Sequence, residues 1–224
     1  MLVWFGNNQF LLNPDGSMYW IEEKSLIVGD LHLEKSTSYI DQGNFLPPYD
    51  TIDTLERLLN ITKELSPNRI IFLGDVLHDN SAFDRLKKKE KQLFKDILKK
   101  NVMWVKGNHD NNFKYVNIKT YTSYKLKNFI FSHISDKKNK LEISAHYHPK
   151  VTFKFKGTKI SKPCFLIDKE KIILPAYGAY TGGLNISSDI YKNVFLNDYQ
   201  FFLTAYLCQN LPCHLPFETL WRNK

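Results

Sequence analysis

Short apolar runs recur along the first half of the chain, and each stops at a glycine followed by Asp or Asn. The runs are SLIVGD at 25–30, RIIFLGD at 69–75, and VMWV at 102–105, which KGNHD follows. Short runs that end in polar loops are typical of buried strands. Between them, 50–65 and 81–100 carry apolar residues near helical spacing, so we expect amphipathic helices capped by Asp50 and Ser81.

Strand and helix alternate in this half, which predicts a largely parallel sheet preceded by a hairpin around the turn NPDG at 13–16. The second half indicates consecutive strands within 116–133, 141–148, 159–168 and 171–178. We therefore predict an α/β fold of two packed mixed β-sheets flanked by helices, a four-layer αββα sandwich. No repeat, low-complexity tract or linker divides the chain, so 1–224 is expected to form a single domain.

Composition narrows the class of protein. The chain has 224 residues, 43% of them hydrophobic, and a formal net charge of +8. A basic surface suits anionic partners such as nucleic acid, but nearly all of the positive charge is Lys in a chain also rich in Asn and Ile, so coding bias explains it equally well. No apolar run approaches the roughly 18 residues of a membrane helix, and the first residues do not resemble a secretory signal.

The three cysteines are sparse and form no CxxC pair, which favours a reducing cytoplasm over a disulfide framework. Cys208, Cys213 and His214 offer too few ligands for a zinc site. We expect them to serve core packing.

Polar residues that can bind metals collect at the ends of the apolar runs. Six of the seven histidines lie there: His32, His78, His109, His133, His146 and His148, together with Asp30, Asp75 and Asn108. Ligand groups gather beyond the carboxyl ends of strands in open α/β sheets. Imidazole, carboxylate and amide without thiolate suit Mn, Fe or Zn. Seven of these residues are ligand candidates, which is too many for one ion: Asp30, His32, Asp75, Asn108, His133, His146 and His148. A bridging carboxylate would divide them over two ions, the usual apparatus for displacement at phosphorus.

The ordered set GDxH, GDxxH, GNHD, His and HxH resembles the calcineurin-like metallophosphoesterase superfamily. The resemblance implies a first metal held by Asp30, His32, Asp75 and His148, and a second held by Asp75, Asn108, His133 and His146. Gly107 would supply the turn of GNHD, and His109 would stay free to protonate the leaving oxygen. GDVLH is similar to the form in the nuclease subunit of double-strand-break repair complexes, which implies that His78 supports His109.

A narrower resemblance covers about 26–186. LPPYDTIDTLERL, GDVLHD and KPCFLIDKEKIILPAYGAYTGGLNI are similar to bacterial phosphoesterases of the PdeM type, whose members are named as DNA ligase-associated DNA damage response endonucleases. Residues 187–224 are left unassigned. Gly178, Gly182 and Gly183 could form a substrate loop beside the metals or a core turn that meets backbone needs.

Some positions depart from the pattern or stay open. Ala145 stands where a Gly usually precedes HxH, and it would be strained if that position requires a positive φ. SHISDKK lacks the Glu-Pro that commonly follows this His, so the loop after His133 is expected to differ in shape. Asp79 and Asp110 could hydrogen-bond a ligand or the catalytic His, or cap their loops.

The sequence thus predicts a two-metal phosphoesterase, with Mn as the expected ion, that hydrolyses phosphodiester bonds by attack of a metal-bound hydroxide. The resemblance implies DNA as substrate and a DNA ligase or helicase repair system as partner. A phosphodiesterase, pyrophosphatase or phosphatase acting on small nucleotides stays open, because fold does not settle substrate. A non-catalytic scaffold is the third alternative. The complete ligand set and His109 argue against it.

Overall fold

The computed structural model describes residues 1–39, 43, 46–110, 112 and 118–204. Its first sheet has the strand order β1-β2-β3-β4-β5-β6-β7. These strands are β1 (Leu2–Phe5), β2 (Asn8–Leu12), β3 (Met18–Trp20), β4 (Ser25–Val28), β5 (Arg69–Leu73), β6 (Val102–Val105) and β7 (Thr120–Tyr121). The strands from β1 to β4 pair antiparallel and those from β4 to β7 pair parallel, so the expected hairpin and parallel sheet are confirmed.

The outer face of this sheet is covered by α2 (Asp50–Leu65) and α4 (Lys88–Leu98), with the short helices α1 (Lys35–Ser38) and α3 (Ala82–Arg85) beside them. Their apolar faces, including Leu55, Leu58 and Phe94, pack on side chains of β4, β5 and β6. This burial explains why the helices form although α4 contains many lysines.

Two local predictions are wrong. Asp50 is the first residue of α2 and not its cap, because its carboxylate accepts hydrogen bonds from the backbone N–H and the hydroxyl of Ser36. The single helix expected at 81–100 is two helices. Leu86 is buried in an extended conformation between α3 and α4, and α4 begins afresh where Glu90 accepts the N–H of Lys87.

The second sheet has the order β14-β11-β12-β13-β10-β9-β8, with β15 paired to β12. Its strands are β8 (Ser123–Leu126), β9 (Phe129–Ser132), β10 (Glu142–Ser144), β11 (Pro149–Phe155), β12 (Thr158–Ile167), β13 (Lys171–Ile173), β14 (Leu184–Asn185) and β15 (Gln200–Leu203). β9, β10 and β13 pair parallel, whereas β8, β11, β12 and β15 have antiparallel neighbours. Both sheets are therefore mixed, as predicted.

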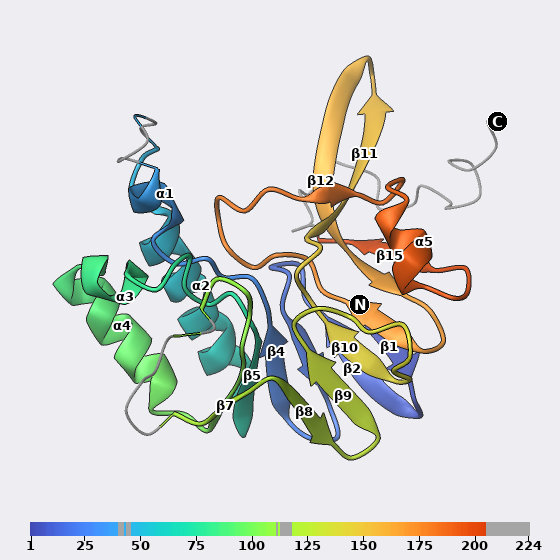
Figure 1. Ribbon diagram of the computed structural model, residues 1–224, viewed down its shortest axis with the longest axis horizontal. Coiled ribbons are helices and arrows are strands. Elements are labelled where there is room, and N and C mark those ends of the chain that lie inside the picture. The colour runs from blue at the N-terminus through green and yellow to red at the C-terminus, as the bar shows by residue number, and fades with distance from the viewer. Residues whose placement is uncertain (40–42, 44–45, 111, 113–117, 205–224) are drawn as a thin grey trace.

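The two sheets pack face to face through an aromatic core. Trp20 and Phe10 of the first sheet lie 4.9 and 5.4 Å, between ring centroids, from Phe129 of the second, both edge-on. In Figure 1, α2 and α4 lie to the left of the strands, and α5 (Ile190–Val194), which packs on β12 and β13 of the second sheet, lies at the upper right. The outermost layer is thinner than a four-layer sandwich suggests, because α5 is a helix of five residues.

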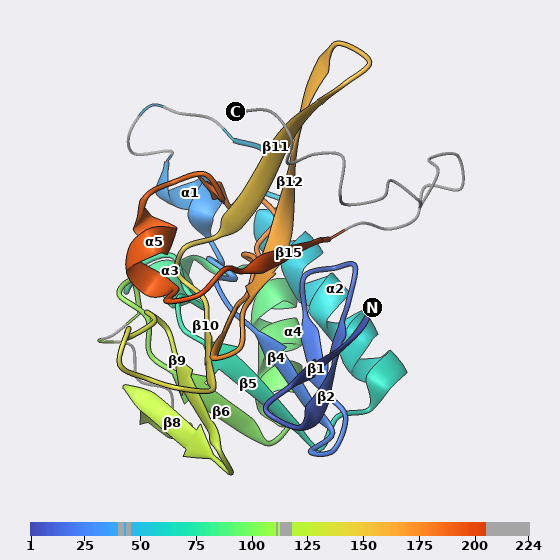
Figure 2. The ribbon, with the colours of Figure 1, turned by 90° about the vertical axis from the view of Figure 1, so that its right-hand side faces the viewer.

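β11 and β12 extend past the rest of the fold as a long two-stranded arm, which both ribbon views show (Figures 1 and 2). In the part of the chain that the structure describes, no helix combines the length and apolar character that crossing a membrane requires.

Candidate metal centre

The predicted ligands meet where the carboxyl ends of parallel strands from both sheets converge. Asp30 and His32 follow β4, Asp75 follows β5 and Asn108 follows β6, and these three strands are neighbours in the first sheet. His133 follows β9, and HxH at 146–148 follows the adjacent strand β10. Because the sheets face each other, ligands about 100 residues apart become neighbours.

Small residues permit this close approach. A Cβ added to Gly107 would lie 2.0 Å from Asp75 Oδ1, and one added to Gly74 would lie 2.5 Å from His133 Nδ1. Gly107 has no positive φ, so the expectation that it supplies a turn is replaced by a need for space. Ala145 also lacks a positive φ and is therefore unstrained. Its Cβ instead fills the space that a Cβ on Gly29 would occupy, at 2.5 Å.

The first group of potential ligands comprises Asp30, His32 and His148, whose ligand atoms lie within 4.8 Å of one another. His148 Nε2 is 3.2 Å from Asp30 Oδ1 and 3.4 Å from His32 Nε2. Asp30 is fully buried, and burial lowers the pKa of His32 to about 3 against the opposing pull of the nearby carboxylates. His32 is therefore neutral, as a metal ligand must be.

The second group comprises Asp75, His133 and His146, with Asn108 beside them. His133 Nδ1–H donates to the carbonyl oxygen of Leu73 at 2.7 Å, so Nε2 faces the centre. Around that nitrogen lie Asn108 Oδ1 at 3.0 Å, His146 Nδ1 at 3.1 Å and Asp75 Oδ2 at 3.3 Å.

Asp75 lies between the two groups. Its Oδ2 is 3.3 Å from His133 Nε2 and 3.8 Å from His32 Nε2, while Oδ1 accepts the backbone N–H of His109 at 2.9 Å. Burial alone would raise the pKa of Asp75, but the hydrogen bond and charge of His133 outweigh it and the net shift is downward. Burial lowers the pKa of His133, yet Asp75 and Asp30 raise it overall to about 8.

The donor set fits divalent cations. Asp30 Oδ1 is buried and accepts no hydrogen bond from the described residues, an arrangement that is costly unless a cation compensates it. In the second group, Asp75 Oδ2 and Asn108 Oδ1 converge on Nε2 of His133, which carries a lone pair in the neutral ring because Nδ1–H donates to Leu73. A cation or a proton at this nitrogen offsets the convergence of acceptors, in keeping with the raised pKa of His133.

Backbone strain collects at the same residues. Of twelve described non-glycine residues with positive φ, five belong to the predicted ligand set: Asp30, His32, Asp75, His146 and His148. Such conformations cost of order 1–3 kcal/mol for non-glycine residues and persist where surrounding structure enforces them, typically at functional sites.

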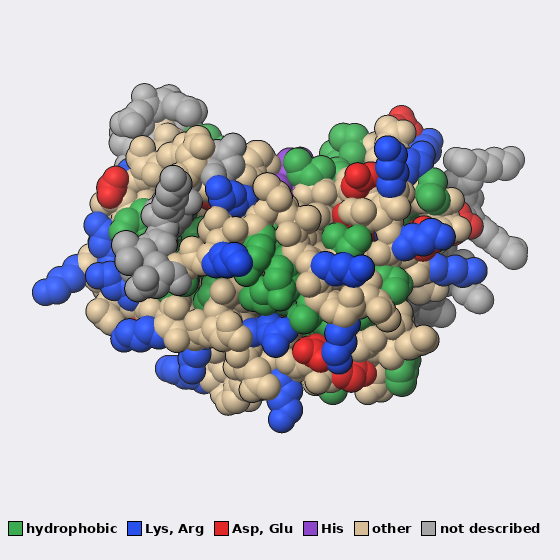
Figure 3. All heavy atoms as spheres, turned by 60° about the horizontal axis from the view of Figure 1, so that its bottom comes forward, with side chains coloured by type: hydrophobic (Ala, Val, Ile, Leu, Met, Phe, Trp, Pro, Cys, Tyr) green, Lys and Arg blue, Asp and Glu red, His purple; other side chains and the backbone are tan. Residues whose placement is uncertain are grey.

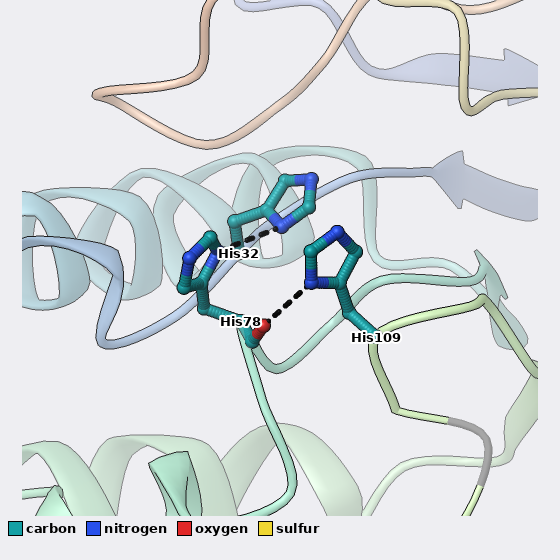
Figure 4. A group of neighbouring side chains, drawn as sticks. All are labelled: His32, His78 and His109. Carbon is teal, nitrogen blue, oxygen red and sulfur yellow. Dashed lines mark hydrogen bonds between the residues drawn. The ribbon is translucent and has the colours of Figure 1, made fainter. Parts of the chain in front are cut away.

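His109 lies beside His32 of the first group, with ring centroids 5.0 Å apart (Figure 4), and the ligand atoms of His32, His78 and His109 also lie within 4.8 Å of one another. Its Nδ1–H donates to the backbone carbonyl of His78 at 2.7 Å, which leaves Nε2 on the far side of the ring. The His78 ring stacks on His109 with centroids 5.1 Å apart, and its Nδ1 lies 3.3 Å from His32 Nδ1. Burial lowers the pKa of His78 to about 4, so its ring is neutral and able to accept a hydrogen bond from His32.

The remaining predicted residues divide by their contacts. Asp79 accepts hydrogen bonds from the N–H of Ser81 and from Arg85. Asp110 accepts them from the N–H groups of Gly107 and Val76 and from the indole of Trp104. Within the described part of the chain, neither carboxylate hydrogen-bonds a histidine. Gly178 and Gly183 lie against the backbone carbonyls of Leu31 and His148, whereas a Cβ on Gly182 would meet open space. Cys208, Cys213 and His214 lie outside the described residues.

The sequence does not reveal the groups that orient the rings of His133 and His109. The carbonyl oxygens of Leu73 and His78 select the tautomers of His133 and His109, and no side-chain pattern could reveal backbone acceptors.

Comparison with known proteins gives one family. The sequence model described as Calcineurin-like phosphoesterase matches residues 24–201. The crystal structure of Pseudomonas putida nuclease MPE is similar in fold, with a TM-score of 0.72 and 23% identity over 92% of this chain and 95% of that chain. Yfce, a phosphoesterase from E. coli, gives a TM-score of 0.40 and 15% identity over 71% and 83% of the two chains, too low to support an argument. No curated protein matches the chain.

Proposed function

The chain belongs to the calcineurin-like phosphoesterase family and is a metal-dependent phosphoesterase, and from this premise we propose that it cleaves phosphodiester bonds in DNA. The observation that carries the chemistry is the convergence of seven side chains into two groups that share Asp75. Two divalent ions bound there would neutralise phosphoryl oxygens and lower the pKa of a water molecule so that it can attack phosphorus.

We propose the following roles for the ligands. Asp30, His32 and His148 would hold one ion, and Asn108, His133 and His146 would hold the other. Asp75, which lies between the two groups, would serve both ions, and its Oδ1 accepts the backbone N–H of His109.

His109 has the geometry of a general acid. The protonated ring donates Nδ1–H to the His78 carbonyl, and its Nε2–H is available to the leaving oxygen of the substrate. After transfer, the neutral ring keeps its proton on Nδ1, because a carbonyl can only accept. His78 is thus a positioning residue, through its backbone oxygen and its stacked ring rather than through a proton of its own.

The proposal also names the metal, manganese, and the substrate, DNA. Imidazole, carboxylate and amide ligands suit Mn, and Fe or Zn would also be accepted. DNA is supported by the resemblance of the sequence motifs, and the fold neighbour from Pseudomonas putida is a nuclease. We also propose that the protein works with a DNA ligase or helicase repair system. The three sparse cysteines favour a reducing compartment.

The test compares two leaving groups. Purified protein with Mn²⁺ should hydrolyse both bis-p-nitrophenyl phosphate and a DNA oligonucleotide. His109→Ala should slow DNA cleavage by about 10²–10⁴-fold, and nitrophenyl ester cleavage less, because nitrophenolate leaves without a proton. Metal content should stay at the wild-type value.

Equal losses on both substrates would show that His109 is structural, and no loss on either would reject the mechanism. Hydrolysis of the nitrophenyl ester without cleavage of any DNA would replace DNA by a small nucleotide as the substrate. Failure to bind or use any divalent metal would revive the non-catalytic scaffold.

A further inference from the structure

The β11–β12 hairpin begins directly at the metal site. Its first residue, Pro149, follows His148, and the base of β11 pairs with β14 at Pro149 and Lys150. An open pocket beside this base is lined by His146, Tyr147, His148, Gly183, Leu184 and Ile190. A substrate at the metal site therefore lies next to the base of the arm.

The arm carries one sign of charge. Residues 149–164 contain five lysines and no Asp or Glu, whereas the whole chain has 31 basic and 23 acidic residues. On the face of the molecule shown in Figure 3, Lys and Arg side chains are spread over the surface, with Asp and Glu side chains among them. Coding bias accounts for the many lysines along the whole chain, but it does not account for the absence of Asp and Glu from the arm.

The strand register gathers basic groups on one face of the arm. Lys154 and Lys159 are direct partners across the two strands, and Lys150, Thr152 and Ser161 share their face. The hydroxyls of Thr152 and Ser161 lie 3.1 Å apart. Directly opposed residues have Cβ atoms about 4.5–5.5 Å apart, so two like charges there are destabilising. An anion lying over this face would relieve that repulsion.

The length of the arm distinguishes between substrates. Lys154 lies six residues beyond His148 along an extended strand, which is roughly 20 Å at about 3.3 Å per residue. A mononucleotide bound at the metals cannot reach that far. A strand of several nucleotides can, and it presents a regular row of phosphates.

We propose that the basic face of the β11–β12 hairpin binds the phosphate backbone of a nucleic-acid strand whose scissile phosphodiester lies at the metals. The inference rests on the proposed function and adds the binding surface that would make a polymer the substrate. Phosphate contacts from exposed lysines supply affinity without reading sequence, so the arm is expected to act on strands of any sequence.

The test uses a charge-matched pair of variants. Lys154→Gln with Lys159→Gln removes two charges from the arm. The control, Lys95→Gln with Lys100→Gln, removes two exposed charges at the end of α4 that leads into the amino end of β6, away from the site. Binding of a fluorescein-labelled 30-nucleotide DNA is measured by anisotropy against salt in the His109→Ala background, which keeps the strand intact. Hydrolysis of bis-p-nitrophenyl phosphate is measured in the wild-type background.

The arm variant should bind the oligonucleotide roughly threefold to tenfold more weakly at low salt, and its slope of log affinity against log salt should be shallower by about 1.4. Its kcat/KM for bis-p-nitrophenyl phosphate should stay within about twofold of the wild type. The control should change neither quantity.

The proposal would be overturned if the arm variant bound DNA with the same affinity and salt slope as the control variant. It would also be overturned if the arm variant lost nitrophenyl ester hydrolysis as strongly as DNA binding, because the arm would then support the fold or the metal site. Wild-type protein that binds vesicles containing phosphatidylserine but no oligonucleotide would overturn it in favour of a membrane surface. If the wild-type protein did not hydrolyse bis-p-nitrophenyl phosphate, the proposed function would be rejected. The binding data would still decide separately whether the arm binds DNA.

Discussion

Replacing Gly107 by Ala tests whether the two ligand groups depend on close packing around Asp75. The new Cβ would lie 2.0 Å from Asp75 Oδ1, 2.3 Å from its backbone nitrogen and 2.8 Å from its Cγ. Ordinary contacts of this kind begin at 3.4 Å, so the Asp75 carboxylate or the GNHD loop must move by more than 1 Å.

The substitution should affect both the stability of the protein and the rate of hydrolysis. Overpacking of a well-packed interior costs typically 1–3 kcal/mol, which for a chain of this size lowers Tm by about 2–12 °C. A shift of about 1 Å in a positioned group costs about 10²-fold in rate. We expect Gly107→Ala to show both effects and to bind less than the wild-type amount of metal, because Asp75 serves both groups.

The assay combines calorimetry, metal analysis and hydrolysis of bis-p-nitrophenyl phosphate. Gly182→Ala is the matched control for stability and metal content, since its added Cβ meets no atom within 4 Å. Its Tm should stay within the range of a neutral surface substitution. A Gly107→Ala protein with wild-type Tm, metal content and rate would refute the argument that packing against Gly107 positions Asp75.

Three further predictions concern stability and metal binding. Glu142→Gln removes the carboxylate that pairs with Lys171 at 2.9 Å in a fully buried position, so urea unfolding should show a loss of about 3–5 kcal/mol; a loss below 1 kcal/mol would contradict a buried charged pair. Because the pKa of His133 is raised to about 8, a proton competes with the metal below that pH. The affinity for Mn²⁺, measured by calorimetry, should therefore rise about tenfold per pH unit up to about pH 8 and then level off. An affinity that is constant between pH 6 and 8 would contradict this prediction. Chelation should lower Tm reversibly, by about 5–10 °C relative to protein with Mn²⁺ at about 100 times its Kd, and an unchanged Tm would mean that no metal stabilises the fold.

The fold class and the meeting point of the candidate ligands both follow from the pattern of apolar runs. Asp30, Asp75 and Asn108 each end a short apolar run, and parallel strands bring such ends to one edge, so their convergence follows from pattern and topology. The pattern cannot give the distances between side chains and backbone at the site. Gly107 is required, and Ala145 is harmless, because of how closely the neighbouring segments approach.

Helix ends and the arm were harder to predict for a different reason. Asp50 suits a cap by residue type, but its carboxylate accepts hydrogen bonds from Ser36 of α1, 14 residues earlier in the chain. Burial of Leu86 overrides the helical spacing of 81–100. In the arm, β12 was expected, but β11 was not, although Lys and apolar residues alternate along it with the period of a strand.

The most direct test of the metal centre is an anomalous difference map from crystals grown with Mn²⁺. It should show two peaks about 3.5–4 Å apart, one beside Asp30, His32 and His148, the other beside Asn108, His133 and His146, with Asp75 Oδ2 between them. A single peak, or a peak enclosed by His32, His78 and His109, would contradict the account.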